Sequence, residues 1–131
     1  MYKYFQPNKK DLKDNHGDFA IRALCKALDK TWVEIFDGLV PYAREQQCYL
    51  CQKPSYESFL NANNFVYTSI GRISKDMTVK KFASKHNRGT FIVYLKVGFQ
   101  THMVCVQDGD WYDTWDCGNR CVYGYYERKG E

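Results

Sequence analysis

The sequence predicts a single α+β domain, spanning residues 1–131, in which helices come first and an antiparallel sheet follows. A chain of 131 residues can bury one core but is short for two. Apolar side chains recur at steps of three and four between residues 18 and 85, whereas runs rich in Val, Tyr, Thr and Trp fill the chain after Gly89. This segregation favours α+β over alternating βαβ units.

The first predicted helix begins after Asp18, whose side chain is expected to cap it, while the polar residues 1–17 are expected to form an irregular lead-in. The apolar positions of this helix wrap much of its circumference, which predicts a central and largely buried helix. They are Phe19, Ile21, Ala23, Leu24, Ala27 and Leu28.

Three further helices are predicted from start signals. Thr31 with Glu34 three residues later forms a capping box, and Pro41 is expected to shorten or bend the helix that follows. Ser55 and Thr78 are expected to open a third and a fourth helix.

The strands are predicted over 90–97, 101–107, 110–115 and 121–126. Asp108-Gly109 indicates a two-residue hairpin turn, because both central residues of a type I′ turn need positive φ. If Gln107 faces Asp110, then His102 and Asp113 are diagonal neighbours on one face of the sheet.

A histidine held by a carboxylate can act as a general base, since the acid fixes the tautomer and the other ring nitrogen takes a proton. Asp116 competes for this role, but the register puts it on the opposite face, so Asp113 is the predicted partner of His102. Taken alone, such a pair on a strand is more often a structural hydrogen bond than a catalytic one.

Two segments resemble small papain-like cysteine peptidases related to the bacteriocin-leader peptidases, which are common among phage and bacterial proteins. The first is Gly17-Asp18-Phe19-Ala20-Ile21-Arg22-Ala23, similar to the family's nucleophile helix G-D-C-x-x-R-A, with the helix after it. The second runs from His102 through the hairpin to Trp111-Tyr112-Asp113-Thr114-Trp115, similar to the family's histidine strand and acidic third member. The resemblance implies a papain-like fold with His102 and Asp113 as catalytic residues.

Phe19 stands where this family has its nucleophilic cysteine. A phenyl ring cannot attack a carbonyl, so the expected function is that of a pseudo-peptidase that binds a peptide or protein partner in its cleft. The resemblance assigns Asp18, Trp111, Trp115 and Asn15 to binding, Asn15 being one of three amides, with Gln6 and Asn8, that could serve as the oxyanion-hole side chain.

Two alternatives stay open. The first is a cysteine peptidase or amidase in which Phe19 is a substitution peculiar to this chain, so that Phe19→Cys restores hydrolysis. The second is a phage or bacterial interaction protein that uses a basic surface, although a net charge of +4 with scattered Lys and Arg makes nucleic acid an unfavoured partner.

The 6 cysteines are expected to be reduced, since the chain begins without a signal-peptide pattern and a cytoplasmic protein is predicted, with no membrane segment. Cys25 and Cys105 are expected to pack in the core. Cys48, Cys51, Cys117 and Cys121 could form a zinc site or disulfides, but independent thiols are favoured, and no cofactor or metal is expected.

Overall fold

The computed structural model describes residues 1–10, 17–71 and 76–130. Within these residues the architecture is mixed α/β, with helices and strands interleaved as follows. In chain order the elements are β1 (Tyr2–Tyr4), α1 (Phe19–Leu28), α2 (Trp32–Gln46), α3 (Lys53–Ala62), β2 (Phe65–Ser69), α4 (Val79–Lys85), β3 (Thr90–Val97), β4 (Gln100–Gln107), β5 (Asp110–Asp113) and β6 (Val122–Arg128).

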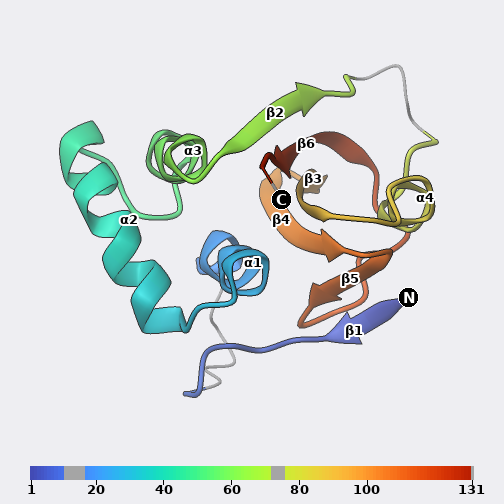
Figure 1. Cartoon of the computed structure of the whole chain (residues 1–131), viewed down its shortest axis with the longest axis horizontal. Helices are drawn as coiled ribbons and strands as arrows, with labels where there is room; N and C mark the ends of the chain where they lie inside the picture. Colours follow the sequence, from blue (N-terminus) through green and yellow to red (C-terminus); the bar gives the residue numbers. More distant parts are fainter. Residues whose placement is uncertain (11–16, 72–75, 131) are drawn as a thin grey trace.

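The strands form one six-stranded sheet in the order β1-β5-β4-β3-β6-β2 (Figure 1). The pairs are antiparallel except for β1, which runs parallel to β5. The prediction that residues 1–17 are irregular is therefore wrong for Tyr2–Tyr4, which form β1. The sequence patterns also do not predict β2. An all-antiparallel sheet that follows the helices is also wrong, because β1 precedes every helix and β2 lies between α3 and α4.

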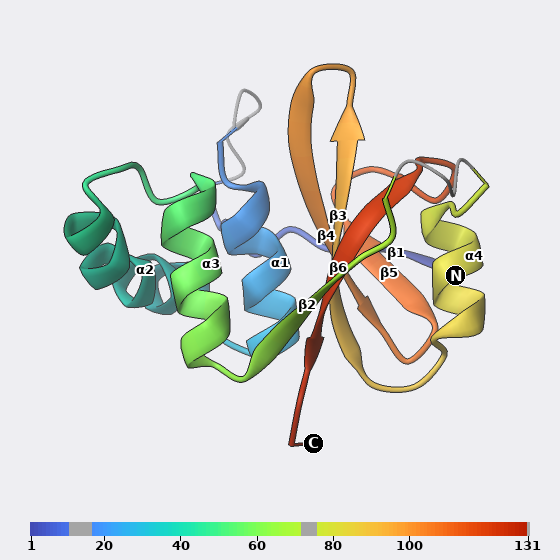
Figure 2. The same cartoon turned by 90° about the horizontal axis from the view of Figure 1, so that it is seen from above.

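Helices cover both faces of the sheet, with α1, α2 and α3 on one side and α4 on the other (Figure 2). Side chains alternate along the central strands between the two resulting cores. Met103 and Cys105 pack with α1, whereas Val104 and Val106 pack with α4. Most of α1 is buried, from Ala20 to Cys25 without a break, which confirms the predicted central helix.

The helix-start predictions have mixed outcomes. The Thr31–Glu34 capping box is present, and Thr78 caps α4 through the backbone N–H of Lys81. Asp18 occupies the N-cap position of α1, but its side chain makes no capping hydrogen bond. The helix α2 continues past Pro41 to Gln46, so the proline does not end it.

The third helix begins earlier than expected. Gln52 occupies its N-cap position and Pro54 lies in its first turn, where a proline loses no helical hydrogen bond. Ser55 is inside the helix, buried, and its hydroxyl contacts the Cys48 sulfur at 2.9 Å.

The β4–β5 hairpin has the predicted register. Asp108 and Gly109 have φ of 51° and 87°, and Gln107 faces Asp110 while Cys105 faces Tyr112. The strand β5 ends at Asp113, so the predicted extension to Trp115 is wrong. Among the described residues, no helix combines the length and apolar character needed to cross a membrane.

Candidate functional site

The site centres on a buried pair formed by His102 of β4 and Asp113 at the end of β5. The imidazole Nε2 lies 2.5 Å from Oδ2 of Asp113, and the two residues are 7% and 3% exposed. Since the carboxylate accepts, Nε2 carries the proton and Nδ1 is the ring nitrogen left to accept one. The contact predicted from the hairpin register is confirmed.

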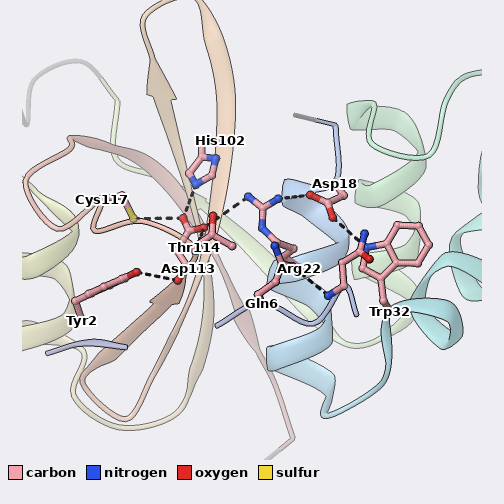
Figure 3. Close-up of polar contacts among 10 residues, drawn as sticks. Tyr2, Gln6, Asp18, Arg22, Trp32, His102, Asp113, Thr114 and Cys117 are labelled. Atoms are coloured by element: carbon pink, nitrogen blue, oxygen red, sulfur yellow. Dashed lines mark hydrogen bonds and ion pairs between the residues drawn. The ribbon is translucent and has the colours of Figure 1, made fainter. Parts of the chain in front are cut away.

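Four donors surround the Asp113 carboxylate (Figure 3). Oδ2 accepts from His102 and from the Cys117 thiol at 3.7 Å. Oδ1 accepts from the backbone N–H of Thr114 at 2.7 Å and lies 3.6 Å from the Arg22 guanidinium. Three hydrogen bonds and one ion pair compensate the desolvation of this buried carboxylate and fix its orientation.

Arg22 connects the start of α1 to this pair. Its guanidinium forms an ion pair with Asp18 through Nη1 and approaches Asp113 through Nη2, so it bridges two buried carboxylates (Figure 3). Asp18 also accepts a hydrogen bond from the Trp32 indole at 3.1 Å. These bonds explain why the Asp18 side chain does not cap its own helix: its oxygens are used by Arg22 and Trp32.

Phe19, the first residue of α1, lies against the histidine. Its ring centroid is 6.1 Å from that of the His102 imidazole, with 47° between the ring planes. Trp115 contacts the same imidazole, with its ring centroid at 5.2 Å. The structure thus brings Phe19, His102 and Asp113 together, and the position beside the imidazole carries an aromatic ring.

A pocket of about 510 Å³ opens on the side of Phe19 away from the sheet, between the start of α1 and the α2–α3 connection. Its lining is largely apolar and includes Phe19, Trp32, Phe36 and Leu50. Phe19 therefore separates this pocket from His102 and contributes to both.

Cys51 belongs to the α2–α3 connection and also lines this pocket. Its side chain lies against the first turn of α1. Burial raises the pKa of the Cys51 thiol, and hydrogen bonds from the backbone N–H groups of Ile21 and Ala20 oppose that rise without cancelling it. The amides that would polarise a group at position 19 are thus directed at a neutral thiol. No local sequence pattern signals this contact, because Cys51 follows α2 and is remote from α1 in the chain.

The remaining predicted site residues lie at different distances from the pair. Trp115 is half-buried beside His102, whereas Trp111 is 6% exposed and packs in the core under α4. Asp116 accepts from the Trp111 indole at 2.9 Å instead of reaching His102. Asn15 lies outside the described residues.

The other two amides considered for the oxyanion hole lie in the segment between β1 and α1. The Gln6 side chain accepts a hydrogen bond from the backbone N–H of Asn8 at 3.0 Å. Among the described residues, neither amide bonds or contacts His102 or Phe19, so the oxyanion-hole assignment stays a prediction.

The cysteines do not form the four-thiolate site considered from the sequence. Within the described chain, which includes all four candidates, the one group of His, Cys, Asp and Glu close enough to share a metal is His102, Asp113 and Cys117. These ligand atoms lie within 4.8 Å of one another. Because His102 bonds Asp113 directly and the Arg22 cation lies beside the carboxylate, a second cation there is disfavoured.

Cys117 is a member of the site that sequence reasoning missed. It is fully buried, and desolvation together with Asp113 raises the pKa of its thiol, so the thiol donates a hydrogen bond as a neutral group. Cys25 and Cys105 are buried, as predicted for core cysteines.

Comparison with protein-family models, with curated proteins and with solved structures found no match to this chain.

Proposed function

We propose that this protein is a papain-like pseudo-peptidase, which binds a peptide or protein partner in the cleft beside Phe19 and does not hydrolyse it. The observation that carries the proposal is the phenyl ring of Phe19 against the imidazole of an otherwise complete His102–Asp113 pair. In a thiol hydrolase, this is the position from which sulfur attacks a carbonyl.

The loss of the nucleophile accounts for the expected inactivity. In a serine protease, removal of the nucleophile lowers turnover by about 10⁶, and only oxyanion-hole and binding contributions remain. Nearby thiols do not replace it, since the Cys51 and Cys117 thiols both have pKa values raised by burial and a neutral thiol is a poor nucleophile.

The apolar pocket next to Phe19 supports binding as the retained activity. Phe19 forms part of the apolar wall of this pocket. A cysteine at the same position, as in the peptidases that the chain resembles, would be smaller and more polar. A concave, mostly apolar surface with a few fixed polar groups is the usual form of a ligand site. Asp18, fixed by Arg22 and Trp32, is a polar group of this lining, and Phe19 links the pocket to His102 through its ring contact with the imidazole.

The test has a hydrolysis arm and a binding arm. Fluorogenic peptide libraries are incubated with the wild-type protein and with His102→Ala, and we expect the same background rate in both. Turnover by wild type that is absent in His102→Ala contradicts the proposal. For binding, peptides are titrated while the NMR signals of the Trp32 indole and the His102 ring are followed, and saturable shifts of both are expected.

A second candidate is a cysteine peptidase or amidase in which Phe19 is a substitution. It is favoured by the tautomer imposed on His102, because Nδ1 is available to take a proton from a group at position 19. Phe19→Cys is then expected to hydrolyse peptides with His102 as general base and Asp113 as its orienting acid. The matched control is Phe19→Cys with His102→Ala, and a folded Phe19→Cys protein without hydrolysis rejects this candidate.

A further inference from the structure

We infer that the partner segment carries a bulky apolar side chain and, about four residues away, an acidic one, and that it lies along α2 from Phe19 to Arg44. This inference rests on the proposed function and specifies the chemistry of its ligand. It is drawn from a second pocket that continues the first.

The second pocket has a volume of about 660 Å³ and is formed by the C-terminal half of α2 and the connection to α3. It shares Phe36, Tyr49, Leu50 and Gln52 with the pocket beside Phe19. The two therefore form one groove along α2, with Tyr49, 82% exposed, on its rim.

The end of the groove at Phe19 fits a large apolar side chain. Trp32 and Phe36 stack there with ring centroids 5.4 Å apart and 17° between planes. The Trp32 indole is fixed by its hydrogen bond to Asp18, which is itself paired with Arg22. A rigid aromatic wall of this kind loses little conformational entropy when a ligand packs on it.

The other end carries one positive charge. Arg44 is the only charged residue among those that line the second pocket, all of which belong to the described chain. The acid that lines the first pocket, Asp18, is 3% exposed and already paired with Arg22. The groove thus runs from an apolar end to a cationic end, which complements a peptide with an apolar and an acidic side chain.

The length of α2 sets the spacing of these two side chains. Phe36, the side of the aromatic wall nearer to Arg44, and Arg44 itself are eight positions apart on the helix, which corresponds to roughly 12 Å. An extended peptide covers about 3.3 Å per residue, so the two side chains are separated by about four residues.

The test uses three peptides with acetylated and amidated ends, in one-letter code FGSGE, FGSGQ and AGSGE. Their dissociation constants are measured by NMR titration at low salt against wild type, Arg44→Gln and, as a matched control on the opposite side of the sheet, Lys80→Gln. We expect FGSGE to bind tightest, with about a two- to fivefold loss for FGSGQ and about a tenfold or greater loss for AGSGE.

Arg44→Gln is expected to abolish the difference between FGSGE and FGSGQ, and Lys80→Gln to preserve it. Equal binding of these two peptides to wild type, with shifts at Trp32, overturns the inference and leaves the proposed function standing. If none of the peptides shifts Trp32 or His102, both the inference and the proposed function are rejected.

Discussion

The Phe19 ring and the His102 imidazole lie 6.1 Å apart between centroids, so the first residue of α1 meets the residue that would act as its base. Under the proposed function, a thiol hydrolase would transfer a proton between these two positions. Here the contact between them is one of aromatic packing, while the bond from His102 to Asp113 is retained. Asp113 therefore still orients His102, but Phe19 offers no thiol or hydroxyl from which the imidazole could take a proton.

Asp113→Asn is expected to lower the free energy of unfolding by about 3–5 kcal/mol, because it removes the charge that Arg22 and His102 share in a buried setting. Urea denaturation measures the change. The matched control is Asp37→Asn on the exposed face of α2, which is expected to change stability by less than about 0.5 kcal/mol. Equal losses in both variants would show that the buried network contributes nothing.

Stability is expected to fall at alkaline pH because of the buried thiols. Burial raises the pKa of Cys25 to about 12, and that of Cys117 also rises. In the unfolded chain a cysteine ionises near pH 8.5, so each buried thiol stabilises the fold fully below about that pH. Above it, each thiol lowers the free energy of unfolding by about 1.4 kcal/mol per pH unit.

Urea unfolding of the reduced protein between about pH 8 and pH 9 measures this slope before the tyrosines, which ionise near pH 10, contribute to it. Cys25→Ala is expected to reduce the slope, whatever its effect on stability at neutral pH. A slope that is unchanged in Cys25→Ala contradicts the prediction.

Cys51 is expected to react slowly with iodoacetamide at neutral pH, since burial raises the pKa of its thiol despite the two amides of α1. Its rate should rise about tenfold per pH unit in proportion to the thiolate fraction. Mass spectrometry of the Cys51 peptide, with the urea-unfolded protein as reference, provides the rates. Alkylation faster than in the unfolded chain would identify Cys51 as an activated thiol and would reopen the question of a nucleophile.

Gly124→Ala is expected to destabilise the β2–β6 edge of the sheet. A Cβ at this position would clash with the Tyr67 hydroxyl, so the Tyr67 ring must swing away from Tyr126. The centroids of these two rings are now 4.9 Å apart. Loss of an aromatic pair costs about 0.5–1.5 kcal/mol. In a Tyr67→Ala background, Gly124→Ala should lower the free energy of unfolding by less than it does in the wild type. Thermal unfolding of wild type, the two single variants and the double variant measures this difference.

The parts of the structure that sequence predicted are those fixed by local chemistry. Asp108-Gly109 determines the turn, the turn determines the register, and the register places His102 beside Asp113. The Thr31–Glu34 box likewise depends only on residues within one helical turn.

The parts that it missed depend on contacts between distant segments. The strand β1 has three residues and exists because it pairs with β5 at the far end of the chain. Arg22, Cys117 and Cys51 join the site through tertiary packing of their own elements, which no local pattern encodes. The Asp18 carboxylate, predicted to cap α1, is instead used by Arg22 one turn further along the helix and by the Trp32 indole of α2.

The parallel pairing of β1 with β5 has a consequence for the order of folding. Bonding His102 to Asp113 closes a loop of 11 residues, whereas pairing Tyr2 with Trp111 closes one of 109. Loop-closure entropy makes the longer closure less favourable by about 2 kcal/mol. We therefore expect the hairpin, with its histidine and aspartate, to form early as a local unit, and β1 and α1 to dock on it late, bringing Phe19 and Arg22 to the site in the final steps.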